Sequence, residues 1–509
     1  MPIIKSTLTA ILLLLMSIRL VAGSPVLERE FGRFSSDPAL KHASWSFLVT
    51  DLETGIPLIS HDHQRALCPA SVQKLITTAS ALITFGAQHT LPTELQYDGF
   101  IDENGTLQGN LYIFGGGDPS LGSSFWDKSP SFEDLVANWL ELLRSAGIAR
   151  VLGDIIADDS AFDRDMIPRK YLWEDIGNYY GAGSSALTFN ENTYTVFFDA
   201  GQSMGAPARV KSVLPEIPSM KLLNEVTTGQ RGSGDQVYIF GAPYVSDRLL
   251  TGTVPLGATS FPVRGSMPDP ALFLVQYFTD YLKNNGIAVE GQATSVHALL
   301  TRNTISGSPA NINMQTVTPY SPITPVQLRA QAGVWMSPPL TDIINRANTG
   351  SVNVYTENLL KLLGRELFGQ GSFKAGVDAM VKIWSDRGMD VSGMKLHDGS
   401  GLAPSNRVTA GQIGFILSYM WRHESFRHFH ESLPLAGHSG SLSGFFRNTA
   451  SEGVLRAKSG YLGNVRSYAG YTTMKNGRQV AFVLIVNDYD GSPAAMRNKM
   501  FQLMDAIAK

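Results

Sequence analysis

The sequence predicts a multi-domain α/β protein whose main sheet is built from both ends of the chain. The length of 509 residues exceeds that of an average domain, and the composition, 43% hydrophobic and 17% charged, is that of an ordinary globular chain. Strand patterns occur near both termini with helical patterns between them, which is typical of an α/β core. We therefore expect one domain of residues 24–90 and 315–509. Short strands, turns and loops fill most of the interval, which predicts an inserted, mainly β region of residues 91–314.

The first 23 residues have the pattern of a secretory signal peptide. Lys5 precedes an apolar run, Leu8–Met16, that is too short to span a membrane, and the small residues Val21-Ala22-Gly23 suit cleavage near Gly23. An uncleaved anchor is the alternative. No later stretch is long and apolar enough to cross a bilayer, so we expect a mature protein that is exported across the inner membrane and works in the periplasm.

The amino-terminal part predicts two strands followed by a helix. The strands are Trp45–Asp51 and Pro57–Ser60, joined by a turn at Glu53-Thr54-Gly55. The helix is expected over Ser71–Phe85, because Pro69 precedes it and Gly86 follows it. Its apolar stripe consists of Val72, Leu75, Ile76, Ala79 and Leu82.

Helices and then strands are expected in the remainder. The inserted region contains one clear helical pattern, Phe132–Ala146. Further helices are predicted at Leu340–Asn348, Val354–Phe368, Ala375–Arg387 and Ala494–Ala508. Strands are predicted at Val454–Lys458, Val465–Thr473 and Val480–Val486, the last two joined by a turn at Lys475-Asn476-Gly477.

Three short motifs follow one another in an order typical of serine acyl enzymes whose base is a lysine. They are Ser71-Val72-Gln73-Lys74, Ser351-Val352-Asn353 and Lys458-Ser459-Gly460. The second and third patterns occur once each. A second Ser-x-x-Lys, Ser392–Lys395, falls between them and lacks a helical stripe, so we interpret it as a surface turn.

Ser71 and Lys74 are the predicted nucleophile and general base. Three residues apart on a helix, their side chains lie on one face and within reach of each other. The positive end of the helix dipole and a second nearby cation would lower the pKa of Lys74, so that a neutral amine could accept the serine proton near pH 7. The alternative is that Ser71 caps the helix and Lys74 is solvated.

The other two motifs supply partners for this pair. Ser351 could relay a proton to the leaving amine, and Asn353 could hold Lys74 and the substrate amide. Alternatively, or in addition to this role, Ser351 caps the Val354 helix. Lys458 and Ser459 suit a substrate carboxylate. The missing side chain of Gly460 lets a substrate approach. The backbone N–H groups of Ser71 and Tyr461 could form an oxyanion hole.

Other functional classes receive little support. The net charge of −3 gives no excess of positive charge that would favour binding of nucleic acid. Cys68, the single cysteine, precedes Ser71 by three residues, and we interpret it as a packed apolar residue rather than a rival nucleophile. His61 and His63 form an isolated pair that we expect at the surface. We therefore predict no metal and no cofactor.

These residues resemble the class C, low-molecular-mass penicillin-binding proteins, the D-alanyl-D-alanine carboxypeptidase/endopeptidase family. The resemblance covers nearly the whole mature chain, and the long gap between Ser71 and Ser351 is characteristic of it. Its further matches are Pro69-Ala70-Ser71, Gly115-Gly116-Gly117-Asp118-Pro119, Trp173-Glu174-Asp175 leading to Tyr180-Gly181-Ala182, Asp398-Gly399-Ser400-Gly401-Leu402, and Leu433-Pro434-Leu435-Ala436-Gly437.

The resemblance implies a fold and a substrate. The fold is a penicillin-recognising, β-lactamase-like transpeptidase domain, an antiparallel sheet with helices, and we expect two mainly β domains inserted in it. The substrates are peptidoglycan peptides, cut at the terminal D-Ala-D-Ala bond or at the cross-link through an acyl-enzyme on Ser71, which penicillin and other β-lactams would also acylate. By resemblance, Asp175 and Tyr180 would face the side chain of the diamino residue.

Two departures from the family pattern concern charge. A lysine usually precedes Ser-x-Asn, whereas this chain has Thr349-Gly350. An arginine often follows the Asp398–Leu402 segment, whereas the nearest here is Arg407. Three other functions stay open at this point: a serine β-lactamase, a related serine esterase, and a catalytically inactive cell-wall-binding scaffold.

Overall fold

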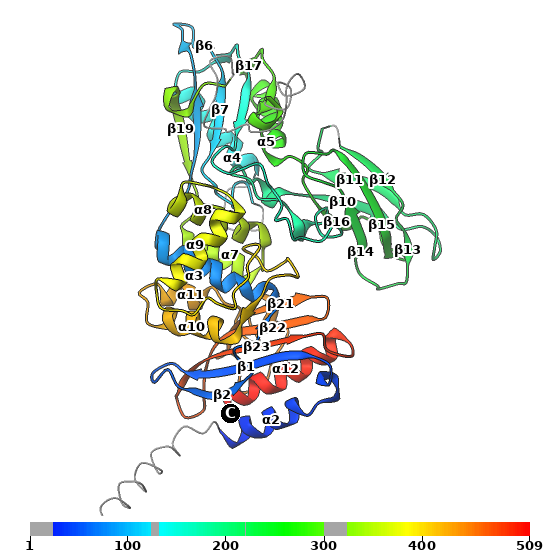
Figure 1. Cartoon of the computed structure of the whole chain (residues 1–509). Coiled ribbons are helices and arrows are strands. Elements are labelled where there is room, and N and C mark those ends of the chain that lie inside the picture. Colours follow the sequence, from blue (N-terminus) through cyan, green and yellow to red (C-terminus); the bar gives the residue numbers. More distant parts are fainter. Residues whose placement is uncertain (1–23, 124–131, 219, 300–322) are drawn as a thin grey trace, which may run out of the picture.

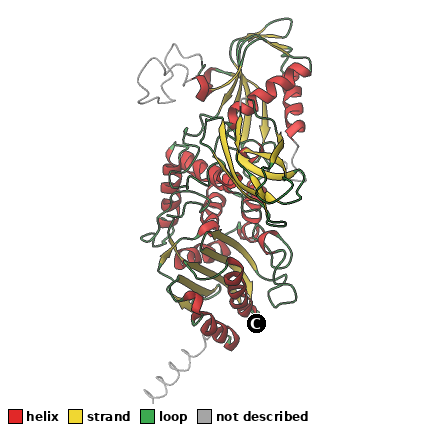
Figure 2. Ribbon diagram, turned by 90° about the vertical axis from the view of Figure 1, so that its right-hand side faces the viewer, coloured by secondary structure: helices red, strands yellow, loops and turns green. Residues whose placement is uncertain are grey.

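The computed structural model describes residues 24–123, 132–218, 220–299 and 323–509. The predicted signal peptide, residues 1–23, lies outside the described residues. The molecule is elongated, with the sheet built from both termini at one end and the inserted region at the other (Figure 1). A group of helices lies between them, and the view turned by 90° shows the same order of layers (Figure 2).

The two ends of the chain form one five-stranded antiparallel sheet, as predicted. Its order is β2-β1-β23-β22-β21, and β21 is an edge strand. The strands are β1 (Ser44–Asp51), β2 (Pro57–His61), β21 (Arg456–Leu462), β22 (Val465–Thr473) and β23 (Gln479–Asn487). Successive residues of β23 enter two different cores, because helices cover both faces of the sheet. The continuous apolar run Val480–Val486 therefore predicted a buried strand correctly.

Helices α2 (Pro25–Ser35) and α12 (Pro493–Ala508) cover one face of this sheet. Helix α12 confirms the predicted terminal helix. Helix α2 was not predicted, although Ser24 caps it and Pro25 occupies its first position. The opposite face packs against α10 (Ala410–Trp421), which was also missed. Its residues are apolar on all sides, so it has no amphipathic period to recognise.

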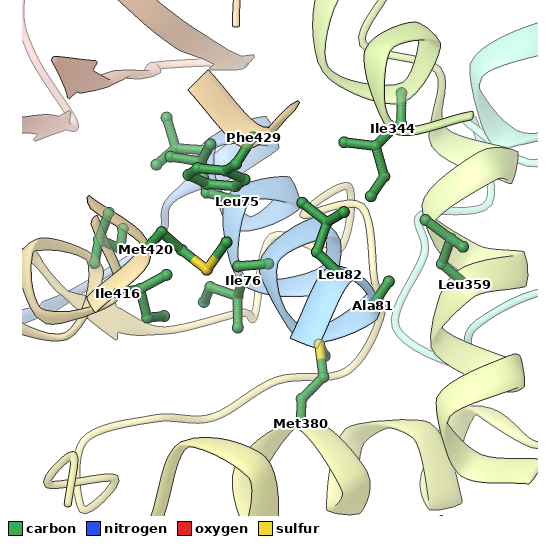
Figure 3. Close-up of a cluster of buried hydrophobic side chains, with 14 of the residues drawn as sticks. Leu75, Ile76, Ala81, Leu82, Ile344, Leu359, Met380, Ile416, Met420 and Phe429 are labelled. Atoms are coloured by element: carbon green, nitrogen blue, oxygen red, sulfur yellow. The ribbon is translucent and has the colours of Figure 1, made fainter. Parts of the chain in front are cut away.

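Helix α3 (Lys74–Phe85) runs through the middle of the main core. The predicted stripe is buried, and α3 meets α7 (Leu340–Thr349), α8 (Asn353–Phe368), α9 (Phe373–Ser385) and α11 (Phe426–Glu431). Figure 3 shows Leu75, Ile76 and Leu82 of α3 surrounded by side chains from these helices and from α10. Gly86 ends the helix with φ +80°, as its position predicted. The first turn differs from the expected helix, because Ala70–Gln73 form a 3₁₀ turn.

The inserted region has two parts. The part nearer the helices combines two sheets with helices α4 (Phe132–Ser145) and α5 (Pro270–Asn284). One sheet has the order β18-β9-β7-β4-β19, with strands Ala293–Ser295, Ile155–Asp158, Leu111–Gly115, Pro92–Tyr97 and Ala330–Met336. The other has the order β17-β8-β6-β5, with strands Ala288–Val289, Arg150–Val151, Thr106–Gln108 and Phe100–Ile101.

The second part of the insertion consists of strands, as expected. A three-stranded sheet has the order β11-β10-β16, with strands Arg209–Leu214, Thr193–Asp199 and Phe261–Ser266. The other sheet contains β12 (Lys221–Asn224), β13 (Thr227–Gly229), β14 (Gln236–Phe240) and β15 (Asp247–Pro255). Apolar side chains from both sheets form one core between them.

Helix α5 is a second helix in an inserted region where only one, Phe132–Ala146, was expected. Its many aromatic and β-branched residues are typical of strands, so the composition of this segment did not predict a helix. Asp269 caps its amino terminus and Pro270 opens it, so the start signal was present.

The division of the chain into domains stays a proposal. The expected boundary at residue 314 lies outside the described residues. Strand β19 pairs with β4 and so belongs to a sheet of the inserted region. We therefore propose that the inserted region ends after Met336, later than expected.

Helices α8 and α9 approach so closely that glycine is required between them. A Cβ atom on Gly376 would lie 2.2 Å from the Leu360 carbonyl oxygen, and one on Gly364 would lie 2.6 Å from the Gly376 nitrogen. We predict that Gly376→Ala lowers the free energy of unfolding by about 1–3 kcal/mol despite alanine's better helix propensity. The matched control is Gly32→Ala in α2, where no atom lies within 4 Å; it should stabilise by about 0.5–1 kcal/mol. Denaturant unfolding measures both, and a stabilising Gly376→Ala would contradict the close approach.

Candidate active site

Ser71 lies on a tight turn at the start of α3. Ala70 has a left-handed φ of +44°, and the main chain at Gly401 approaches so closely that a Cβ there would lie 2.0 Å from the Ala70 carbonyl oxygen. The 3₁₀ turn Ala70–Gln73 leads directly into α3, whose first residue is Lys74. Ser71 and Lys74 therefore lie on one face of this turn, within contact distance, as their spacing predicted.

Lys74 is buried and meets three oxygen atoms, two of them from distant parts of the chain. Its Nζ lies 3.1 Å from Ser71 Oγ, 2.6 Å from Asn353 Oδ1 and 2.9 Å from the Ser400 carbonyl oxygen. Burial lowers the pKa of Lys74 to about 7, while the Glu357 and Asp398 carboxyl groups act in the opposite direction. Burial is therefore the main cause of the shift, in place of the expected neighbouring cation.

The three contacts suit a neutral amine that accepts a proton. A neutral Lys74 has two N–H groups and one lone pair, and neither the Asn353 amide oxygen nor the Ser400 carbonyl can donate. When the two N–H groups point to these fixed acceptors, the lone pair faces the Ser71 hydroxyl. The geometry thus places a base on the nucleophile, which is what deprotonation of a serine requires.

Ser351 lies in the break between α7 and α8 with a left-handed φ of +54°. Its Oγ accepts a hydrogen bond from Lys458 Nζ at 2.9 Å. The alternative of a helix-capping Ser351 is wrong, because α8 begins at Asn353 and its N-cap is Val352. A left-handed conformation in a non-glycine residue costs free energy, and such residues cluster at functional sites.

Lys458 projects from the edge strand β21 into the same site. It is fully buried, and its Nζ also donates to the Ser459 carbonyl at 2.8 Å. Burial, together with the nearby Lys74, holds the pKa of Lys458 well below its ordinary value. Strand β21 begins at Arg456 and runs to Leu462, so the strand predicted to end at Lys458 instead contains the whole third motif.

The remaining members of the third motif lie along β21. Ser459 Oγ contacts Ser441 Oγ at 2.7 Å, and Tyr461 is exposed, with the Arg466 guanidinium over its ring. A Cβ on Gly460 would lie 2.9 Å from the Ser71 nitrogen and 2.8 Å from the Pro69 carbonyl oxygen. Because Gly460 has no side chain, edge strand β21 can pack directly against the turn that carries Ser71. The same absence was expected to leave room for the substrate.

The inserted region contributes a carboxylate to the edge of the site. Asn353 Nδ2 donates to the Tyr180 carbonyl at 2.6 Å, which fixes the Asp175–Tyr180 segment next to Lys74. Asp175 is buried, and burial together with the neighbouring Glu174 raises its pKa to about 6. A hydrogen bond from the Tyr180 side chain partly offsets this shift. Asp175 Oδ2 has no hydrogen-bond partner within the described residues.

Comparison with known proteins identifies the family. The family model described as the D-Ala-D-Ala carboxypeptidase 3 (S13) family matches residues 27–305 and 318–509. The chain belongs to this family. It is accordingly an enzyme, a serine-type D-Ala-D-Ala carboxypeptidase, and the predicted relationship is confirmed.

Individual relatives match over most of their length. The D-alanyl-D-alanine carboxypeptidase of Actinomadura sp. strain R39 is 31% identical, over 95% of this chain and 84% of its own. The D-alanyl-D-alanine carboxypeptidase DacB of Haemophilus influenzae is 24% identical, over 90% of this chain and 88% of its own. The crystal structure of penicillin binding protein 4 (dacB) from Haemophilus influenzae has a TM-score of 0.74 at 21% identity and covers 91% of this chain and 95% of its own, which confirms the fold.

Four residues of the candidate site were not predicted as site residues: Tyr171, Glu357, Asp398 and Ser400. Glu357 follows Asn353 by four residues, so it lies on the same face of α8. That spacing was a signal in the sequence. Asp398 and Ser400 belong to a segment already recognised as a family match. Tyr171 comes from the inserted region, and nothing in the sequence connects it with Glu357.

The two departures from the family pattern have structural counterparts. Thr349 Oγ1 donates to the Ser432 carbonyl at 2.9 Å, and the Arg346 side chain lies beside Gly350, where a Cβ would be 2.8 Å from Arg346 Nη1. A different cation thus lies beside the position of the missing lysine. Arg407 donates to the carbonyls of Pro404 and Asn406.

The rejected candidates lie where the sequence placed them. Cys68 is buried, and its backbone is held by the Asn487 side chain. Burial raises the pKa of the Cys68 thiol, which disfavours a thiolate. Ser392 and Lys395 lie at a turn on the surface.

Among the described residues, no three His, Cys, Asp or Glu side chains gather as metal ligands would, and no helix is long and apolar enough to cross a membrane.

Proposed function

We propose that the carboxypeptidase reaction proceeds through an acyl-enzyme on Ser71 with Lys74 as the general base. The observation that carries the proposal is the burial of Lys74 between the Ser71 hydroxyl and two acceptors that cannot donate. Lys74 takes the serine proton as Ser71 Oγ attacks the carbonyl carbon of the D-Ala-D-Ala bond. The amine leaves with a proton, and water then releases the shortened peptide.

The Ser351–Lys458 pair serves the leaving group and the substrate carboxylate. Lys458 donates to Ser351 Oγ, so the Ser351 proton is free to pass to the departing amine while Lys458 or Lys74 replaces it. Lys458 and Ser459 bind the terminal carboxylate, whose charge compensates the buried ammonium. The backbone N–H groups of Ser71 and Tyr461 hold the developing oxyanion, since edge strand β21 lies against the Ser71 turn.

Asp175 and Tyr180 are proposed to bind the side chain of the diamino residue of peptidoglycan. The free Oδ2 of Asp175 is a suitable acceptor for an ammonium group. A cation there would also lower the raised pKa of Asp175 and keep it ionised. The same site would accept a cross-linked peptide, which makes an endopeptidase activity part of the proposal.

We also propose that penicillin acylates Ser71 and that the enzyme acts outside the cytoplasm. A β-lactam amide presents a carbonyl and a carboxylate to the same groups as the peptide. A homologous fold, that of penicillin binding protein 4 from Haemophilus influenzae, was solved in complex with a β-lactam. The predicted signal peptide and a peptidoglycan substrate both support a periplasmic location.

The first prediction concerns the nucleophile. Ser71→Ala should abolish stable labelling by fluorescent penicillin and release of D-alanine from a pentapeptide muropeptide, because no oxygen remains to form the ester. Ser392→Ala, in the second Ser-x-x-Lys, is the matched control and should behave as the wild type. Gel fluorescence and a D-alanine assay measure the two reactions. Labelled Ser71→Ala would contradict the assignment, and rapid loss of label from the wild type would indicate a β-lactamase.

The second prediction separates the diamino-residue site from the catalytic centre. Asp175→Asn should reduce kcat/KM for the muropeptide by about tenfold or more, because an amide loses the charge-assisted hydrogen bond. The rate of acylation by penicillin, which lacks that side chain, should change far less. Glu225→Gln, an exposed carboxylate of the same inserted region, is the control. Equal losses with both substrates would show that Asp175 supports the catalytic centre instead.

A further inference from the structure

A buried carboxylate behind the base takes no part in the steps above. Glu357 lies one helical turn after Asn353 on α8 and is 1% exposed. An isolated buried carboxylate is costly, so its hydrogen-bond partners indicate what holds it there.

Three donors converge on Glu357. Its Oε2 accepts from the Gly399 nitrogen at 2.8 Å, and its Oε1 accepts from the Ser400 nitrogen at 2.9 Å and from the Tyr171 hydroxyl at 2.7 Å. Backbone N–H groups can only donate, and an ionised carboxylate can only accept, so the arrangement matches the charged form. Glu357 therefore fixes two consecutive peptide groups.

The fixed segment carries one of the acceptors of Lys74. The Ser400 carbonyl accepts from Lys74 Nζ at 2.9 Å, and the next N–H, that of Gly401, donates to Asp398 Oδ1 at 2.7 Å. Thr77 Oγ1 donates to the Gly399 carbonyl at 2.6 Å. The Ser400 carbonyl shares its peptide group with the Gly401 N–H, which Asp398 holds. The preceding peptide group is held by Glu357 through the Ser400 N–H, so Asp398 sets the direction of the Ser400 carbonyl directly and Glu357 sets it through the adjoining peptide group.

We propose that Glu357 is a positioning residue for Lys74: by fixing the peptide group that adjoins the Ser400 carbonyl, it keeps the lone pair of the amine on Ser71. The proposal rests on Lys74 acting as the base. Tyr171 takes part from the inserted region, because its hydroxyl contacts both Glu357 Oε1 and Ser400 Oγ at 2.9 Å or less. Tyr171 precedes Asp175 by four residues, so the inserted region contributes to the base as well as to substrate binding.

The charge of Glu357 has a second, separable effect. The groups that face Lys74 and Glu357 are Asp398, Lys458 on β21 and Tyr171. Glu357 and Asp398 both act to raise the pKa of Lys74 against the larger effect of burial. Burial and the Asp398 carboxyl raise the pKa of Glu357 itself, and the hydrogen bonds from Gly399, Ser400 and Tyr171 oppose that shift and favour the charged form. Removing the charge at position 357 should lower the pKa of Lys74 further, whereas shortening the side chain should disturb position and keep the charge.

The test is the pH dependence of acylation by fluorescent penicillin between about pH 5 and pH 9. In Glu357→Gln the acidic limb of the pH–rate profile should move to lower pH by about half a unit or more, because the pKa of Lys74 falls. The maximal acylation rate, on the plateau of the profile, should fall by about tenfold, because the base is less well positioned. In Glu357→Asp the limb should stay near its wild-type position while the plateau falls. Tyr171→Phe should lower the plateau by a few fold with little movement of the limb. Tyr471→Phe, which removes a buried hydroxyl bonded to the Leu417 carbonyl, is the control and should keep the wild-type profile.

The outcomes separate this inference from the proposed function. If penicillin does not label the wild type, or if it labels Ser71→Ala, the proposed function itself is contradicted, whatever the Glu357 variants do. If those two behave as expected and Glu357→Gln retains the wild-type limb and plateau, the positioning role is wrong and the base assignment stands. If Glu357→Gln does not fold, Tyr171→Phe decides, since it keeps the carboxylate; an unchanged plateau there overturns the inference.

Discussion

The desolvation of Lys74 is the constraint on which the arrangement of this molecule depends. An amine removed from water loses much of its preference for the charged form, and here burial brings its pKa to about 7. Such a group persists only if its N–H groups find partners, and these come from the first residue of α8 and from the 398–401 segment. The chain must therefore bring residues 71–74, 353 and 400 together with sub-ångström accuracy. The sheet formed by both termini and the core around α3 provide that accuracy.

A second lysine increases the electrostatic cost of the site and explains its remaining features. Lys74 lies near enough to Lys458 to disfavour the charge of Lys458, and both side chains are buried. Two buried carboxyl groups, Glu357 and Asp398, offset part of that positive charge, and a substrate carboxylate would offset more. The charges of the site are therefore better compensated when an anionic substrate is bound than when the site is empty. The strained Ser351 and the close approach of Gly460 are consequences of fitting these groups into one small volume.

Local patterns predicted those parts of the molecule where one element carries its own signal. The three motifs, the strands of the terminal sheet and helices α3, α7, α8, α9 and α12 follow from periodicity, caps and spacing. The missed elements differ in their reasons: α10 is apolar all round, and α5 is rich in residues that favour strands. Helix α2 carried a start signal in Ser24 and Pro25 and was still not predicted. Contacts between distant segments were beyond prediction for a different reason. Nothing in the order of residues indicates that Tyr171 meets Glu357, or that burial, more than a cation, lowers the pKa of Lys74.

The most direct test of this account is the ionisation of Lys74 itself. In protein labelled with ¹³C at the lysine ε-carbons, the Lys74 signal can be assigned by its loss in Lys74→Arg and followed by NMR as a function of pH. The account predicts a titration with a pKa of about 7, far from the ordinary 10.5. Because burial is the main cause, acylation of Ser71 at a given pH should follow the neutral fraction of this group. A Lys74 that titrates near its ordinary value would contradict the central claim, since the amine would then be charged at neutral pH and unable to accept the serine proton.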